Sequence, residues 1–157
     1  MAGRYFEQWQ VGDTIAHAVT RTVTETDNVL VSALTHNPQP MHLDHEVAAA
    51  SEFGKPIVNS IYTFGLMVGV SVSDTTQGTL VANLGYDKVR MPAPVFIGDT
   101  LYAESEILAK RDSASRPNAG VVTARTTARK ADSTVVMTFE RAFLVPKRAA
   151  ARSQERQ

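Results

Sequence analysis

The sequence contains no cysteine, which excludes disulfides, thiolate metal sites and cysteine nucleophiles. Neither sign of charge is in excess, because 16 basic residues balance 16 acidic ones, so we expect no nucleic-acid partner and no binding to an anionic membrane. No apolar run is long enough to span a membrane, and residues 1–10 lack the apolar core of a signal peptide. These absences predict a soluble, cytoplasmic protein.

One stretch of the sequence, Asn59 to Asp74, is apolar on nearly every side. A helix of this kind must be enclosed by other parts of a protein, so we predict a buried central helix capped by Asn59 or Ser60. Gly65 and Gly69 should let other backbone come close to it. An ordinary core helix without a chemical role is the alternative for this segment.

Two shorter helices are expected before the central one, with a rigid loop between them. The apolar residues of the first helix recur at helical spacing and are Val29, Leu30, Ala33 and Leu34. Asp44 is a suitable cap for the second helix, whereas Pro38 and Pro40 forbid a helix between the two. The expected ranges are 24–35 and 44–50 for the helices and 36–42 for an extended loop.

The rest of the chain alternates with a period of two, which is typical of strands. Several of the predicted faces carry small residues such as Ala103, Ser105 and Ala124, which suits a sheet that curves closely round a bulky helix. The expected strands are residues 14–24, 80–90, 100–110, 120–130 and 133–145. We therefore predict one α+β domain over residues 1–146 and a disordered tail over residues 147–157.

An antiparallel sheet wrapped round one long apolar helix is the hot-dog architecture. Five short motifs, in their order and spacing, resemble those of the MaoC-like dehydratases, the R-specific enoyl-CoA hydratases of the single hot-dog type. The motifs are V-G-D at 11–13, T-R-T-V-T-E at 20–25, P-M-H-L-D at 40–44, F-G-K-P-I-V at 53–58 and P-V-F-I-G-D-T at 94–100. The resemblance extends to about Pro146 and implies the hot-dog fold.

The resemblance assigns the chemistry to the segment N-P-Q-P-M-H, from Asn37 to His42. Family members place an aspartate five residues before the histidine and an asparagine three before it, and the aspartate and histidine hold the water that adds across the double bond. Here the histidine is His42, whereas Asn37 and Gln39 replace the other two residues. Asn37 can orient water but cannot take its proton, so we predict that His42 transfers the proton. A buried, hydrogen-bonded histidine without a catalytic role is the alternative.

A second departure lies at the start of the central helix, where many relatives have His-Gly and this chain has Asn59-Ser60. In the family, a backbone N–H at the glycine position binds the thioester oxygen. The resemblance therefore gives this role to the Ser60 N–H, at the positive end of the helix dipole. For the Asn59 side chain, simple capping is the alternative to substrate binding, and Gln39 is a further candidate for binding the substrate.

These departures, together with G-Y-D-K-V-R at 85–90 and S-R-P-N at 115–118, look like the branch of the family that contains mesaconyl-CoA and itaconyl-CoA hydratases. Such branched dicarboxylyl-CoA substrates carry a carboxylate of their own, which needs a cation or several donors nearby. Lys88, Arg90 and Arg116 are the candidates, and for each a solvated surface charge or a contact with a CoA phosphate is the alternative. His36, next to Asn37, is a candidate for a second titrating group.

The predicted function is that of a lyase, the reversible hydration of a short 2-enoyl-CoA thioester. We expect no metal and no redox cofactor, and coenzyme A arrives as part of the substrate. Two alternatives stay open: a hot-dog acyl-CoA thioesterase, which usually relies on a carboxylate near the helix start, and a non-catalytic acyl-CoA-binding subunit. The family also implies a homodimer with active sites at its interface, which would protect the sheet edges.

Overall fold

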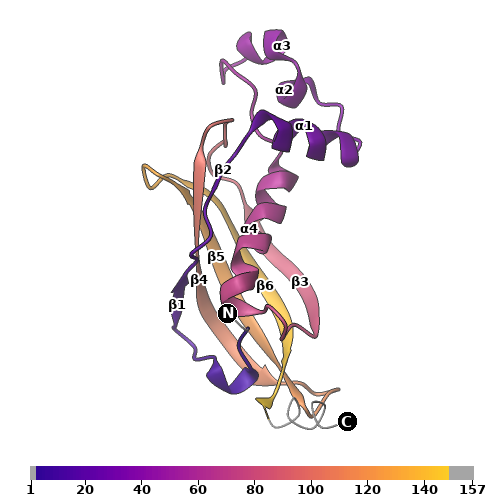
Figure 1. Ribbon diagram of the computed structural model, residues 1–157, viewed down its shortest axis with the longest axis vertical. Coiled ribbons are helices and arrows are strands. Elements are labelled where there is room, and N and C mark those ends of the chain that lie inside the picture. Colours follow the sequence, from indigo (N-terminus) through magenta and orange to yellow (C-terminus); the bar gives the residue numbers. More distant parts are fainter. Residues whose placement is uncertain (1–2, 149–157) are drawn as a thin grey trace.

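The computed structural model describes residues 3–148 and contains an antiparallel sheet wrapped round a long helix, α4 (Ser60–Thr75) (Figure 1). The strand order is β1-β4-β5-β6-β3, and β2 also pairs with β4. The strands are β1 (Thr14–Ala16), β2 (Arg21–Thr22), β3 (Ala82–Arg90), β4 (Thr100–Asp112), β5 (Ala119–Lys130) and β6 (Val135–Pro146). The predicted α+β class and its sheet-round-helix arrangement are confirmed.

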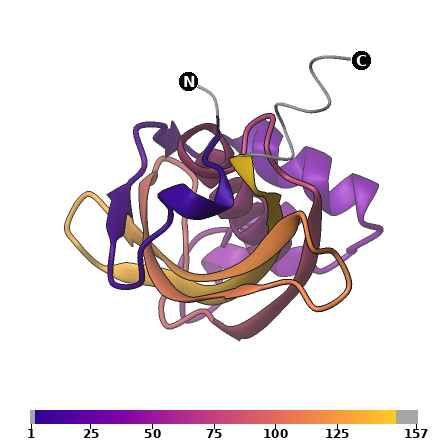
Figure 2. The same ribbon diagram turned by 90° about the horizontal axis from the view of Figure 1, so that it is seen from below.

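The concave face of the sheet packs on α4 and forms the main core (Figure 2). Met67 of α4 is completely buried there, against Phe139 of β6. Ala103 of β4 and Ala128 of β5 lie opposite each other in the register and belong to the same core. Their small side chains leave room for the helix, as the sequence pattern predicts.

One face of α4 is not covered within the described chain, contrary to the expectation of a fully enclosed helix. Ile61 is 54% exposed, and Gly65 and Gly69 are also exposed. Apart from the neighbouring residues and backbone of α4 itself, no atom of residues 3–148 lies within 4 Å of the position that a Cβ would take at either glycine, so the expected close approach of backbone does not occur. The two glycines instead line a hollow of about 690 Å³. Apolar surface of α4 therefore remains open.

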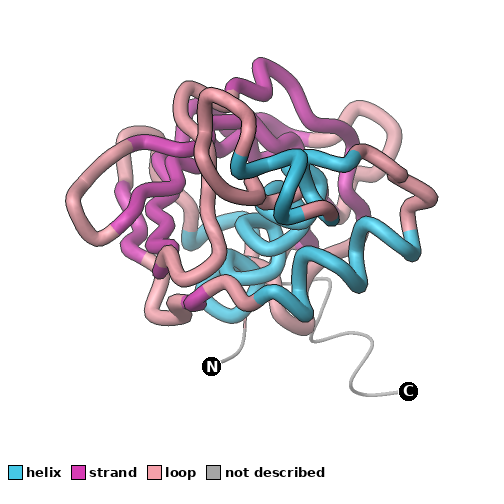
Figure 3. Tube along the Cα trace, turned by 90° about the horizontal axis from the view of Figure 1, so that it is seen from above, coloured by secondary structure: helices cyan, strands magenta, loops and turns pink. Residues whose placement is uncertain are grey.

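Three helices lie together beyond one end of the sheet, near the N-terminal end of α4 (Figures 1 and 3). They are α1 (Glu25–Leu34), α2 (Pro40–Leu43) and α3 (His45–Ala49). Asp44 caps α3 as predicted, because its side chain accepts hydrogen bonds from two backbone N–H groups of that helix. The prediction of an extended loop over residues 36–42 is wrong for its last three residues, which belong to α2. Pro40 begins α2, since the first position of a helix needs no N–H donor.

Helix α1 turns the opposite face inward from the one that its apolar pattern predicts. Leu34 is 71% exposed and Leu30 is 55% exposed, whereas Asn28 and Ser32 are buried. Asn28 and Ser32 are four residues apart and therefore share one face of the helix. Polar contacts, described below, hold this face against the start of α4.

The remaining predicted strands agree with the structure to within two residues, with two corrections. The predicted strand 14–24 is divided into β1 and β2, because the Ala18 N–H donates to the side chain of Asp74 rather than to a neighbouring strand. The predicted alternation would place Ala109 on the same buried face as Ala103 and Ser105, but an irregularity between Ile107 and Ala109 leaves Ala109 exposed. Residues 149–157 of the predicted tail lie outside the described residues. None of the helices within residues 3–148 has the length and hydropathy of a membrane span.

Candidate active site

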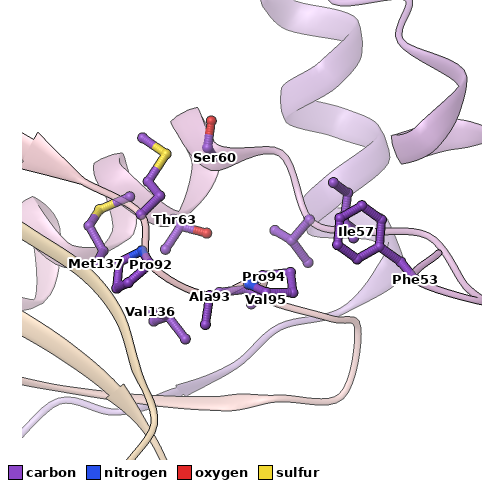
Figure 4. A pocket seen from close by; sticks show the side chains of 12 residues that line it. Phe53, Ile57, Ser60, Thr63, Pro92, Ala93, Pro94, Val95, Val136 and Met137 are labelled. Atoms are coloured by element: carbon purple, nitrogen blue, oxygen red, sulfur yellow. The ribbon is translucent and has the colours of Figure 1, made fainter.

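A pocket of about 390 Å³ opens at the N-terminal end of α4 (Figure 4). Residues 91–95 and 136–137 form one side of it, and residues 57–60 lead along its wall into the helix. Its lining is apolar, with Phe53, Pro92 and Met137 among the larger side chains. Ser60 and Thr63 are the polar residues of the lining, and no charged residue among residues 3–148 belongs to it. The pocket therefore suits a small, largely apolar group.

His42 is fixed against the backbone of the pocket wall. Its Nδ1 lies 2.9 Å from the carbonyl oxygen of Ile57, a residue that lines the pocket. Because a carbonyl can only accept, Nδ1 carries the hydrogen, and Nε2 of the neutral ring holds a free electron pair. Within residues 3–148, Nε2 has no hydrogen-bond partner. The half-buried imidazole is thus prepared to accept a proton from a bound water.

Asn28 joins the segments that carry His42 and the helix start, and the sequence analysis did not identify it. Its Nδ2 donates to the His42 carbonyl oxygen at 2.9 Å and lies 3.4 Å from that of Ile57. Its Oδ1 accepts from the Asn59 N–H at 2.8 Å. The residue is completely buried. One signal was available in the sequence: an asparagine and a serine four residues apart on a helix whose other residues are mostly apolar.

Asn59 caps α4, which confirms the capping interpretation of its side chain. Its Oδ1 accepts from the Ile61 N–H at 3.0 Å, and its Nδ2 donates to the Ser32 hydroxyl at 3.2 Å. The cap thus leaves the Ser60 N–H, at the first helical position, without an acceptor in the part of the chain that the structure describes. A free N–H at the positive end of a helix can stabilise an oxygen that gains negative charge.

Asn37 and Gln39 lie in the turn that leads to α2. The Asn37 Oδ1 accepts from the Gln39 N–H at 3.1 Å, and the Asn37 N–H donates to the Ser32 carbonyl oxygen at 2.9 Å. Asn37 is half-buried, whereas Gln39 and His36 are exposed. Neither Asn37 nor Gln39 belongs to the pocket lining. Their roles in positioning water and binding substrate stay predictions.

None of the three basic candidates lines the pocket. Lys88 forms an ion pair of 3.1 Å with Glu140, and Arg90 is exposed beside it. Both border a separate groove of about 250 Å³ that Arg125 also lines. Arg116 is exposed in the turn between β4 and β5. The structure therefore does not bring these three side chains together with His42 and Ser60. Among residues 3–148, no three His, Asp or Glu side chains meet as a metal site.

The chain is similar to known proteins over most of its length. A model of the MaoC like domain matches residues 7–130. A mesaconyl-CoA hydratase of Cereibacter sphaeroides is 37% identical over 150 residues, which are 96% of this chain and 43% of that protein. The chain spans less than half the length of the mesaconyl-CoA hydratases that it matches.

Solved structures share the fold. A monoamine oxidase regulatory protein from an Archaeoglobus species has a TM-score of 0.82 and 34% identity, over 94% of this chain and 97% of that one. A Mycobacterium tuberculosis protein described as a double hot-dog fold has a TM-score of 0.83 and 23% identity, over 92% of this chain and 44% of that one. The predicted hot-dog architecture is confirmed.

Proposed function

Because this chain belongs to the MaoC-like domain family, we propose that it is a lyase that reversibly hydrates a short 2-enoyl-CoA thioester. One observation carries the proposal: the free Ser60 N–H lies at a pocket whose wall also fixes the His42 imidazole. An oxyanion donor and a proton carrier are the two groups that this reaction requires.

The reaction needs one proton to leave water and one to reach carbon. His42 Nε2 takes a proton as the water oxygen bonds to C3 of the enoyl group. The electron pair of the double bond moves through C2 onto the thioester oxygen, where the Ser60 N–H and the dipole of α4 stabilise the enolate. The protonated imidazole then gives its proton to C2. Asn37, whose Nδ2 has no partner in the described residues, orients the water by donating to it.

The proposed acyl group is a branched dicarboxylyl group of the mesaconyl or itaconyl type. The similarity to a mesaconyl-CoA hydratase supports this choice, as does a pocket volume that suits a short acyl chain. Coenzyme A enters as part of the substrate, without another cofactor. We also propose a cytoplasmic homodimer, in which a second copy would cover the open face of α4.

Thioester hydrolysis, the first alternative, receives less support, since no carboxylate lines the pocket among residues 3–148. The second alternative, a non-catalytic acyl-CoA-binding subunit, draws its support from Asn37, which stands where family members have an aspartate. Only a measurement of turnover separates binding from catalysis.

The test uses the purified full chain with crotonyl-CoA, mesaconyl-CoA and itaconyl-CoA. Loss of the enoyl absorbance reports hydration, and a thiol reagent reports released CoA without background, because the protein has no cysteine. We expect hydration without thiol release, fastest with a dicarboxylyl ester. Thiol release would favour the thioesterase, and binding by calorimetry without turnover would favour the non-catalytic subunit; either result would overturn the proposal.

A further inference from the structure

Thr63 places a buried hydroxyl in the pocket wall without a hydrogen-bond partner. The residue is 2% exposed, and its Oγ1 finds no acceptor or donor within residues 3–148. A buried hydroxyl without a partner destabilises a fold, so its presence calls for a reason. Since Thr63 lines the pocket, a bound ligand is the available partner (Figure 4).

Three other hydroxyls on the helices of this protein are bonded to the helix itself, whereas those of Thr76 and Thr79, at and just after the end of α4, also lack a partner among residues 3–148 but do not line this pocket. Thr35 donates to the Val31 carbonyl oxygen at 2.7 Å, Ser71 donates to that of Val68 at 2.7 Å, and Thr75 donates to that of Ser71. Bonding to a carbonyl three or four residues earlier is the usual way for serine and threonine to satisfy a hydroxyl on a helix. Thr63 departs from this pattern, at the position that borders the pocket.

The pocket also lacks any other means of recognising a charged acyl group. Within the described part of the chain its lining contains no basic residue, and Lys88, Arg90 and Arg116 are not part of it. Ser60 and Thr63 are three residues apart and so lie on one face of α4, both at the pocket. The Ser60 N–H serves the thioester oxygen in the proposed reaction, which leaves the Thr63 hydroxyl one turn further along the helix.

We propose that Thr63 determines substrate specificity by donating a hydrogen bond from Oγ1 to a carboxylate oxygen of the acyl group. The inference rests on the proposed function and names the group that would select a dicarboxylyl thioester. A hydrogen bond to a charged acceptor is stronger than one between neutral groups, so loss of this hydroxyl should weaken binding of the ester that carries the carboxylate selectively.

The test compares T63V, which removes the hydroxyl at nearly constant shape, with T63S, which keeps it. T75V is the matched control, because Thr75 is an equally buried threonine of α4 whose hydroxyl bonds the helix itself. The probes are succinyl-CoA and butyryl-CoA, which are saturated thioesters with and without the carboxylate, and their Kd values are measured by calorimetry on the full chain. Mesaconyl-CoA and crotonyl-CoA give the same comparison in kcat/KM.

We expect T63V to reduce the preference for succinyl-CoA over butyryl-CoA about 10- to 100-fold, with T63S and T75V near the wild-type ratio. The kcat/KM ratio of mesaconyl-CoA to crotonyl-CoA should fall equally. A T63V protein with an unchanged ratio, or with equal losses for both esters, would overturn the inference. Wild-type protein that binds succinyl-CoA selectively through Thr63 but hydrates nothing would overturn the proposed function and leave the inference standing.

Discussion

The two ends of α4 place polar groups in different surroundings, although the hydroxyl of Thr76, at the C-terminal end, also lacks a partner among residues 3–148. At the N-terminal end, the Ser60 N–H and the Thr63 hydroxyl border a pocket, and neither has a partner in the described part of the chain. Toward the C-terminal end, Asp74 belongs to a chain of hydrogen bonds that runs from the helix into the sheet. The contrast separates groups that are available to a ligand from groups that hold the fold together.

This second group of residues, the His17 cluster, consists of His17, Asp74, Ser105 and Thr126. His17 Nε2 lies 2.8 Å from the Ser105 hydroxyl, and the Ser105 hydroxyl lies 2.8 Å from that of Thr126. His17 Nδ1 lies 3.4 Å from the Asp74 carboxylate. The His17 side chain is completely buried, and Ser105 and Thr126 are 2% and 3% exposed.

The arrangement of aspartate, histidine and serine in the His17 cluster superficially matches that of a hydrolase, yet its surroundings differ from those of His42. Ser105 and Thr126 face each other on β4 and β5 beneath the helix, and each hydroxyl is already bonded. A nucleophile must reach its substrate, and a buried serine with a satisfied hydroxyl does not. We therefore infer that the His17 cluster stabilises the fold and that the residues at the N-terminal end of α4 carry out the reaction.

The largest expected effect is that of H42A, which removes the proposed proton carrier. We predict that kcat for the preferred enoyl-CoA falls about 100- to 10,000-fold, the usual contribution of general acid–base catalysis. The half-buried imidazole contributes little to the core, so the melting temperature should change little. Steady-state kinetics and thermal unfolding test both parts. More than half of the wild-type kcat would remove His42 from the mechanism.

N28A should weaken both activity and stability, since Asn28 holds the His42 segment and the start of α4 in place without contacting the substrate. It leaves the Asn59 N–H and the His42 carbonyl oxygen without partners, so we expect a loss of about 3 kcal/mol in unfolding free energy. We also expect kcat to fall about 10- to 100-fold, because the loop of His42 and the start of α4 lose their common support. Denaturant unfolding and kinetics measure the two losses. A stable variant with full kcat would show that Asn28 positions neither segment.

The fold was largely predictable because it follows from hydrophobic periodicity. Alternating residues in β4 to β6 and the apolar run of α4 specify a sheet around a helix, and Asn59 and Asp44 identify two helix starts. The orientation of α1 was not predictable in this way. Its exposed leucines follow the apolar pattern, whereas the contacts of Asn28 that fix the helix come from residues far along the chain.

The candidate site was predictable only in part, for a related reason. The motif around His42 and the helix start at Ser60 are local in sequence; Ser60 lines the pocket, and His42, outside the lining, contacts the carbonyl oxygen of Ile57 in its wall. Whether the Thr63 hydroxyl has a partner depends on which neighbouring side chains reach it. Such properties arise from packing between distant segments, which periodicity does not encode.

His17 contributes to the stability of the fold, whereas His42 is the proposed proton carrier. Burial lowers the pKa of His17 below its ordinary value of about 6.5, and the nearby Asp74 offsets only part of this effect, while Arg4 adds to it. The folded state therefore prefers neutral His17. The stability it contributes is complete above about pH 6.5 and is lost as the pH falls toward the lowered pKa, because the unfolded chain binds the proton first.

We predict that H17Q lowers the unfolding free energy at pH 8 by about 1 to 3 kcal/mol and reduces its decrease between pH 7 and pH 5. The kcat of the folded variant at pH 8 should stay near the wild-type value. Urea unfolding at several pH values and kinetics at pH 8 are the measurements. A large loss of kcat with unchanged stability would reverse the assignment of the two histidines.

The smallest effect is expected from R90K, which tests whether the acyl-binding region extends as far as Arg90. Arg90 is exposed and borders the groove of Lys88 and Arg125 rather than the acyl pocket, and its Nη1 donates to the neighbouring Val89 carbonyl oxygen. If it binds the substrate at all, a CoA phosphate fits this location better than the acyl carboxylate.

Lysine keeps the charge but cannot form two parallel hydrogen bonds. We therefore predict a rise in KM of no more than about fivefold, equal for mesaconyl-CoA and crotonyl-CoA, with kcat unchanged, since an exposed ion pair contributes little. A loss confined to mesaconyl-CoA would instead bring Arg90 to the acyl group and contradict the division between the two ends of α4.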